Sequence, residues 1–112
     1  MSVQLILKYT SEYITKLSAF SLMALFSTPL FAVEPPAKEA TCRACHGVKG
    51  AAPIMASYPK LNGQNQAYLE QSLNAYRNDQ RSGGMAAVMA AQAKMLNAEE
   101  ITALSAYYAA QN

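Results

Sequence analysis

Residues 42–46 read Cys-Arg-Ala-Cys-His, and they contain both cysteines and the single histidine of the 112-residue chain. Two thiols three positions apart can add to the two vinyl groups of a haem, and the imidazole that follows then lies beneath the ring as an iron ligand. The motif therefore predicts one covalently bound haem c. Cys42 and Cys45 are the predicted attachment points, and His46 is the predicted proximal ligand.

Three other uses of these cysteines stay open on the sequence alone. A disulfide between them would close a very short loop and would stabilise the fold weakly, because it would remove few unfolded conformations. A thioredoxin-type redox pair needs a preceding strand in a βαβ frame, whereas residues 38–44 are rich in helix formers. A structural zinc ion needs four Cys or His ligands, and the chain offers three. Haem attachment is the interpretation that the pattern favours.

The beginning of the chain differs in composition from the rest. Lysines precede a largely apolar run over residues 17–32, and the charged segment 34–39 follows it. This order is typical of a secretory signal, so residues 1–32 are predicted to be a signal peptide cleaved after Ala32, and residues 33–112 a mono-haem domain. An uncleaved membrane anchor is the alternative, because the apolar run approaches the length of a spanning helix. In either case we expect the haem domain to be periplasmic.

The predicted mature segment is small and nearly neutral. Its 80 residues would build only a marginal core, so a covalently held haem would supply missing apolar mass and the apoprotein should fold poorly. Seven lysine and arginine residues are balanced by six aspartate and glutamate residues in this segment. Such a balance gives no strong field for nucleic acid, which is therefore not an expected partner.

Periodicity predicts an all-α domain without strands. A short helix over residues 38–45 would carry the cysteines, and glycines and prolines make residues 47–62 a loop. Residues 64–78 have one apolar helical face. The alanine-rich residues 85–96 fit either a helix or a loop. A last helix should begin after Asn97, because a glutamate three residues later completes a potential capping box.

The sixth iron ligand cannot be a second histidine of this chain, so a methionine sulfur is the predicted donor. The candidates are Met55, Met85, Met89 and Met95. Met55 follows the proximal ligand closely, and an apolar residue at position 95 would pack in the core. A glycine pair precedes Met85 and Met89 and would let the chain cross the far side of the ring. Methionine ligation raises the reduction potential, which suits an electron carrier.

The order of motifs over residues 38–110 resembles that of the class I c-type cytochromes, in particular one half of the periplasmic di-haem cytochromes c and the related short mono-haem cytochromes. The positions that carry the resemblance are Cys42, Cys45, His46, Gly47, Tyr58, Pro59, Lys60, Leu61, Gly63, Gln64, Tyr68, Leu69, Leu73, Tyr76 and Arg77. The resemblance implies a small cytochrome c fold of about three to five helices around one haem. The pair Tyr107 and Tyr108 would pack the last helix against the first.

The resemblance also implies roles for single residues. In this family the ligand methionine precedes the leucine that opens the last helix by seven positions, which selects Met89 and leaves Met85 as the alternative. A proline seven residues after the histidine is expected to offer its carbonyl to the imidazole N–H, which here would be Pro53. Tyr58 and Leu61 are expected to contact the haem.

The function implied by the resemblance is electron transport rather than catalysis. The expected partners are redox proteins: a bc-type quinol-oxidising complex as donor, and a terminal oxidase or periplasmic reductase as acceptor. The haem-attachment machinery is a further partner, and no small-molecule substrate is expected. The alternatives are a haem c subunit held permanently by a larger oxidoreductase, and a gas sensor or peroxidase-like protein. The last would need an open sixth position and a distal acid or base, for which Arg77, Asp79 and Arg81 are the candidates.

Overall fold

Four α-helices and one short 3₁₀ turn make up the part of the chain that the computed structural model describes, residues 33–112. In chain order they are α2 (Glu39–His46), η1 (Val48–Gly50), α3 (Gln66–Arg77), α4 (Ala86–Ala93) and α5 (Ala98–Ala109). No strand occurs between residues 33 and 112, so the small all-α fold is confirmed. The predicted signal peptide and the alternative anchor lie outside the described residues. Within the described range, no helix has the length and apolar character needed to cross a membrane.

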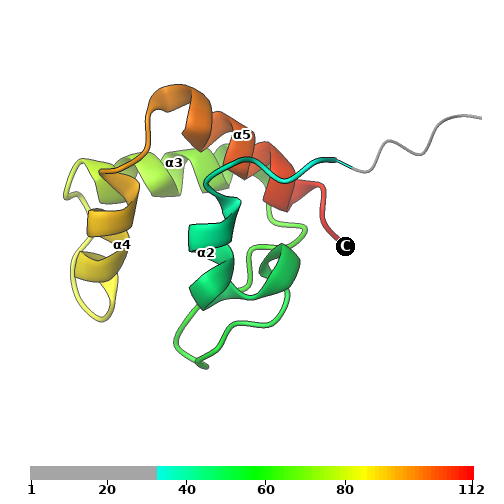
Figure 1. Cartoon of the computed structure of the whole chain (residues 1–112). Helices are drawn as coiled ribbons and strands as arrows, with labels where there is room; N and C mark the ends of the chain where they lie inside the picture. The colour runs from blue at the N-terminus through cyan, green and yellow to red at the C-terminus, as the bar shows by residue number, and fades with distance from the viewer. Residues whose placement is uncertain (1–32) are drawn as a thin grey trace, which may run out of the picture. The chain divides into compact units, whose positions relative to one another are not determined.

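Helices α3 and α5 pack against each other, and both lie in the upper part of the view in Figure 1. The buried face of α5 carries Ile101, Leu104 and Tyr108, each no more than 3% exposed. Their spacing of three and four residues places them on one side of the helix. Leu69 of α3 belongs to the same buried cluster. Each such leucine or isoleucine stabilises the fold by about 1.5–3 kcal/mol through its burial.

Asparagine caps determine where these two helices begin. The side chain of Asn65 accepts a hydrogen bond of 3.0 Å from the backbone N–H of Tyr68 at the start of α3. At the start of α5, the Asn97 side chain accepts from the N–H of Glu100 at 2.8 Å, and the Glu100 carboxylate accepts from the N–H of Asn97 at 3.0 Å. The predicted capping box is confirmed.

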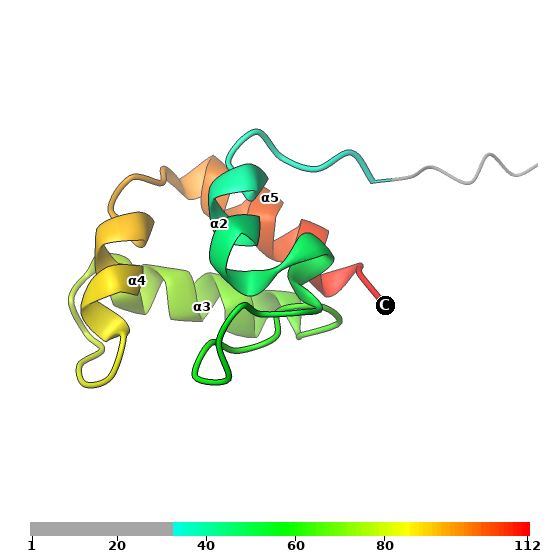
Figure 2. The same cartoon turned by 60° about the horizontal axis from the view of Figure 1, so that its bottom comes forward.

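The alanine-rich segment that fitted either a helix or a loop forms α4. This helix packs against α3, and in both views it stands apart from α2 (Figures 1 and 2). Its buried residues are all alanines: Ala86, Ala90 and Ala93. Alanine is the best helix former, but three alanines give a weak periodic signal in the sequence.

The segment between α2 and α3 is a loop, as predicted, apart from the η1 turn. It begins at Gly47, whose backbone has φ +80°. A Cβ atom at this position would lie 2.1 Å from the carbonyl oxygen of Ala52. Only glycine meets both conditions without strain. The end of the loop is tied to α5, because the N–H of Gly63 donates to the carbonyl of Tyr108 at 3.0 Å.

Candidate haem-binding site

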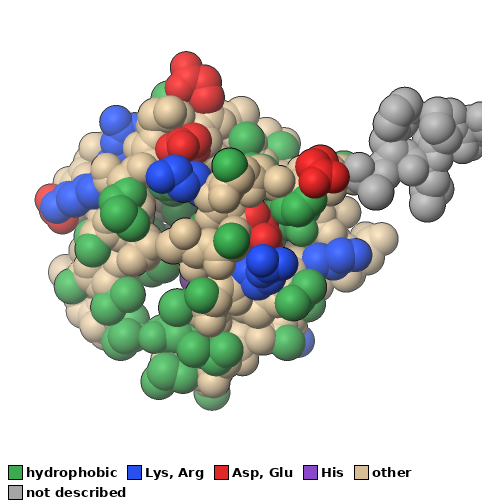
Figure 3. Space-filling view, in the orientation of Figure 1, with side chains coloured by type: hydrophobic (Ala, Val, Ile, Leu, Met, Phe, Trp, Pro, Cys, Tyr) green, Lys and Arg blue, Asp and Glu red, His purple; other side chains and the backbone are tan. Residues whose placement is uncertain are grey.

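A cavity of about 740 Å³ lies among the four helices and the 47–62 loop. Its volume falls within the range of about 300–1,000 Å³ that is typical of cofactor sites. Figure 3 shows this face of the molecule hollowed, with hydrophobic side chains gathered along the lower rim. Tyr58 and Leu61, which were expected to contact the haem, line the cavity, together with Leu69 and Leu73 of α3 and Leu104 of α5. The cavity is therefore suited to a large apolar group.

Helix α2 brings the three motif residues to one wall of this cavity. Cys42 and Cys45 are one helical turn apart, so their side chains lie on the same side of α2. Both line the cavity, as does His46 at the last position of the helix. The cysteines are free thiols rather than a disulfide. The spacing that predicted haem attachment therefore gives a usable arrangement in three dimensions.

The imidazole of His46 is held by a backbone carbonyl. Its Nδ1 lies 2.8 Å from the oxygen of Pro59, and only 6% of the residue is exposed. Since a carbonyl oxygen only accepts, Nδ1 must carry the proton, which leaves Nε2 free to bind a metal. An anchored imidazole of this kind is a better oriented and more basic ligand.

The prediction that Pro53 provides this carbonyl is wrong. The residue after it, Ile54, donates its N–H to the carbonyl of Cys45 at 3.1 Å, so this part of the loop closes against the backbone of α2. Pro53 does not line the cavity, whereas Pro59 does. The loop thus returns to the histidine six residues later than expected.

Two methionines line the cavity from a different helix. Met89 lies within α4 and is partly buried, whereas Met85 is the N-cap residue of α4 and is 40% exposed. Gly83 and Gly84, which precede them, have φ values of +83° and +48°. The left-handed backbone turns the chain from the end of α3 into α4.

The other two methionines lie away from the cavity. Met55 is 50% exposed and Met95 is 58% exposed, and neither contributes to the lining. The expectation that Met95 packs in the core is wrong. Its neighbour Leu96 takes that place and is 8% exposed.

A polar cluster lies on the α3 side of the cavity, and the sequence did not predict that its members would meet. The Arg81 guanidinium lies 4.7 Å from the centre of the Tyr76 ring. A hydrogen bond from Arg81 lowers the pKa of Tyr68, and a second bond with Ser72 acts in the same direction. All four residues line the cavity. Tyr68, Ser72 and Tyr76 are spaced four residues apart, and this spacing indicates that they share one face of α3. The position of Arg81 depends instead on the turn after α3.

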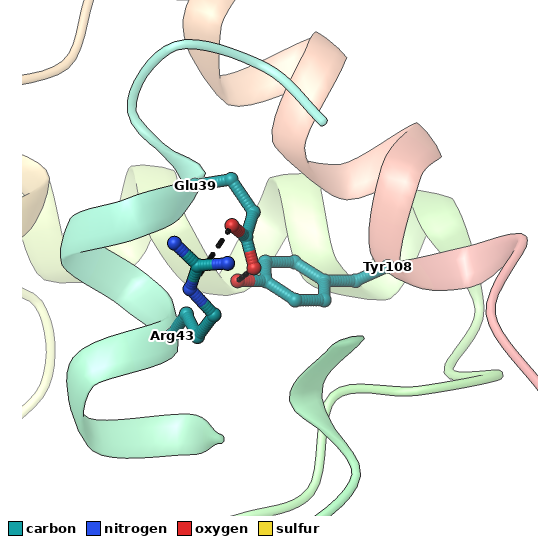
Figure 4. A network of polar contacts seen from close by, with 3 residues as sticks. All are labelled: Glu39, Arg43 and Tyr108. Atoms are coloured by element: carbon teal, nitrogen blue, oxygen red, sulfur yellow. Dashed lines mark hydrogen bonds and ion pairs between the residues drawn. The ribbon is translucent and has the colours of Figure 1, made fainter. Parts of the chain in front are cut away.

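A second cluster lies behind the cysteine wall, where Glu39 is almost fully buried (Figure 4). Its carboxylate accepts a hydrogen bond of 3.3 Å from the hydroxyl of Tyr108 and lies 3.7 Å from the Nε of Arg43. Burial raises the pKa of the Tyr108 hydroxyl. It also raises the pKa of the free Cys42 thiol, and the Glu39 carboxylate adds to that rise. The sequence signal was a glutamate one helical turn before the first motif cysteine.

The donor chemistry of the cavity fits haem c better than the alternative metal. Two thiols and an anchored imidazole lie on one wall, and thioether sulfurs approach from another helix. A structural zinc site needs four nitrogen or sulfur ligands. Between residues 33 and 112, no group of three or more His, Cys, Asp and Glu side chains is placed to hold a metal ion.

Comparison with known proteins agrees with this geometry. The family profile described as Cytochrome c matches residues 37–110. The chain is 50% identical over 76 residues to cytochrome c-554(548) of Halomonas halodenitrificans, a match that covers 66% of this chain and 88% of the relative.

Longer relatives match over part of their length. The chain is 38% identical over 93 residues to the thiosulfate dehydrogenase electron acceptor of Thiomonas intermedia, which covers 82% of this chain and 42% of that protein. It is 36% identical over 67 residues to cytochrome c4 of Stutzerimonas stutzeri, which covers 59% of this chain and 32% of that protein. The family match spans all of the described helices. The chain therefore belongs to the cytochrome c family, as a class I c-type cytochrome that carries electrons on one covalently bound haem c.

Proposed function

We propose that this cytochrome is a periplasmic single-electron shuttle and not an enzyme, with its iron held between His46 and Met89. The observation that supports the proposal is that both side chains line one cavity from two different helices, α2 and α4. Cys42 and Cys45 are the attachment points in this proposal. When bound, the haem iron would accept and release one electron at a time.

The residues around the site suit this task. The hydrogen bond from His46 to the Pro59 carbonyl fixes the ring and its tautomer, so the nitrogen that faces the iron stays in place in both oxidation states. The thioether of Met89 favours ferrous iron and raises the reduction potential. The leucines of α3 and α5 give the cavity an apolar lining.

Met89 is preferred to Met85 as the sixth ligand on two grounds. It lies inside α4, where the helix limits its position, and it is less exposed than Met85 at the helix cap. In the family the ligand precedes the leucine at the start of the last helix by seven residues. Here that leucine is Leu96, just before the N-cap of α5, and the spacing points to Met89 as well.

The surface at the cavity suits brief docking by redox proteins. Met85 and Val88 both line the cavity, and they are 40% and 44% exposed. Electron-transfer partners use small interfaces, and exposed apolar side chains at the mouth of the cavity would fit such an interface. A bc-type quinol-oxidising complex is the proposed donor, and a terminal oxidase or periplasmic reductase the proposed acceptor. A thiosulfate dehydrogenase is a second candidate donor, because two relatives are named as its electron acceptor.

The gas-sensor alternative has little support among the polar residues. Of the three candidate acids or bases, Arg77 and Asp79 do not line the cavity. Asp79 pairs instead with Lys94 at 2.7 Å on the surface. Arg81 does line the cavity, but a guanidinium is always protonated and cannot act as a base. A haem subunit held by a larger oxidoreductase would use the same ligands, and it differs from the shuttle only in the permanence of its partner.

Visible spectroscopy tests the proposal, on haem-loaded protein with and without carbon monoxide. The wild type should be low-spin in both oxidation states and should not bind carbon monoxide. Met89→Ala should bind carbon monoxide in the ferrous state, whereas the matched variant Met85→Ala should behave as the wild type. A wild type that binds carbon monoxide would contradict the shuttle. Carbon monoxide binding by Met85→Ala but not by Met89→Ala would identify Met85 as the ligand.

A further inference from the structure

The feature that the proposed function leaves unused is the buried carboxylate behind the cysteine wall. Glu39 is 3% exposed and lies three residues before Cys42 on α2. A carboxylate is almost never buried to this degree without partners. Here it has two: the Tyr108 hydroxyl at 3.3 Å from one oxygen, and the Arg43 Nε at 3.7 Å from the other (Figure 4).

The carboxylate is close to the predicted point of haem attachment. Its charge contributes to raising the pKa of the Cys42 thiol, second only to burial. Cys42 also packs against the buried cluster that contains Tyr108. Cys42 and Tyr108 both line the haem cavity. The carboxylate, the tyrosine and the attachment sulfur therefore form one contiguous group at the cavity wall.

The two charges of the Glu39–Arg43 pair act on the cavity unequally. The Arg43 side chain is 48% exposed, whereas that of Glu39 is 3% exposed. Water screens the half-exposed guanidinium strongly and the buried carboxylate weakly. The Arg43 Nε is also 3.7 Å away, beyond the usual hydrogen-bond distance. Burial raises the pKa of the nearby Tyr107 hydroxyl, Glu39 raises it further, and Arg43 lowers it by a smaller amount. Beside Cys42 the negative charge of Glu39 therefore outweighs the positive charge of Arg43.

We propose that Glu39 is a positioning and tuning residue that holds the reduction potential of this cytochrome below the value that the axial ligands alone would give. Ferric haem carries one more positive charge than ferrous haem, so a buried anion beside the attachment point favours the ferric state. The proposal rests on the electron-carrier function proposed above. The hydrogen bond from Tyr108 to Glu39 also joins α5 to α2, and it keeps the carboxylate in place.

Potentiometric titration of the haem-loaded protein at neutral pH tests the proposal. Glu39→Gln keeps the shape and an acceptor for Tyr108 but removes the charge. The equilibrium constant for reduction should rise about three- to tenfold, where tenfold corresponds to about 59 mV for one electron. Arg43→Gln removes the opposing charge and should change the constant in the opposite direction by a smaller factor. Glu99→Gln, which removes an exposed carboxylate of α5, should leave it within about 1.5-fold of the wild type.

The outcomes separate this proposal from the function on which it rests. An unchanged potential in Glu39→Gln, with a wild-type visible spectrum, would overturn the tuning role and leave the carrier intact. If Glu39→Gln does not yield folded protein, the test rests on Arg43→Gln, which leaves the hydrogen bond between Tyr108 and Glu39 in place. An unchanged or raised reduction potential in Arg43→Gln would then overturn the tuning role of Glu39. Failure of the carrier function would appear separately, as carbon monoxide binding by the wild type.

Discussion

Side-chain hydrogen bonds hold the α2 wall of the haem cavity, whereas the α4 wall is held mainly by alanine packing. On the α2 side, His46 donates to the carbonyl of Pro59 and Glu39 accepts from Tyr108, and both acidic and imidazole groups are buried. On the α4 side, the buried residues are alanines, and the buried Oε1 atom of Gln92 has no hydrogen-bond partner. The ion pair between Lys94 and Asp79 is exposed.

The difference indicates that the two proposed axial ligands are supported unequally. The imidazole is oriented by contacts that exist without the iron, so its side of the site is preorganised. The proposed methionine ligand lies on α4, a short helix that begins after two glycines with left-handed backbones. We expect changes on the α2 wall and its supports to affect folding strongly, and matched changes on the α4 wall to affect it weakly.

The largest effect should come from removing the haem, which would leave both walls without the group they enclose. In Cys42→Ala/Cys45→Ala the apolar cavity of about 740 Å³ would stay unfilled by haem in an 80-residue domain. Circular dichroism should show reduced helix content and no cooperative thermal transition, in contrast to the haem-loaded wild type. A cooperative transition at the wild-type temperature would show that the helices hold without the cofactor.

The next comparison pairs a residue that supports the α2 wall with a residue of α4. Leu104 belongs to the buried cluster against which Cys42 of α2 packs. Leu104 of α5 is 1% exposed, and its replacement by alanine should lower the free energy of unfolding by about 2–5 kcal/mol. Val88 of α4 is 44% exposed, so Val88→Ala should cost less than about 1 kcal/mol. Denaturant titration of the two haem-loaded variants measures both values. Equal losses of unfolding free energy in the two variants would contradict the claim that the α2 wall and its supports matter more for folding than the α4 wall.

A pair of glycines sharpens the same contrast. Alanine at Gly47 would meet the Ala52 carbonyl in a left-handed backbone, so Gly47→Ala should destabilise the fold by about 3 kcal/mol. Gly83 has a similar φ, but nothing lies within 4 Å of a Cβ atom there, and Gly83→Ala should cost about 1 kcal/mol. Thermal unfolding separates the two. A larger loss at Gly83 than at Gly47 would reverse the comparison.

The smallest effects concern the polar ends of α4 and α5. Asn97→Ala removes the side-chain half of the α5 capping box and should cost about 1 kcal/mol. Lys94→Gln removes the exposed pair with Asp79 and should cost less than about 0.5 kcal/mol. Urea titration distinguishes these values if the two variants are measured side by side. A larger loss of unfolding free energy in Lys94→Gln than in Asn97→Ala would show that α4 depends on its surface charge.

Local signals in the sequence predicted much of this fold. The capping box at Asn97 and the apolar face of residues 64–78 depend on residues one or two helical turns apart, and the helices formed close to the expected bounds. The motif over residues 42–46 likewise predicted the α2 wall, because its three functional residues are neighbours in the chain.

The features that could not be predicted depend on contacts distant in sequence. The carbonyl that meets His46 is that of Pro59 because the 47–62 loop closes against Cys45 and is tied to α5 at its end. The burial of Glu39 requires Tyr108, which lies 69 residues later. The helical state of α4 was ambiguous because alanines pack closely without leaving a periodic pattern.

The central claim, that the iron is held between His46 and Met89, is tested most directly by proton NMR of the reduced, haem-loaded protein. The methyl group of an iron-bound methionine lies over the haem and is displaced far upfield by the ring current. The account predicts one such methyl resonance, assigned to Met89 and retained in Met85→Ala. An upfield methyl resonance that belongs to Met85, or the absence of any such resonance, would contradict the account.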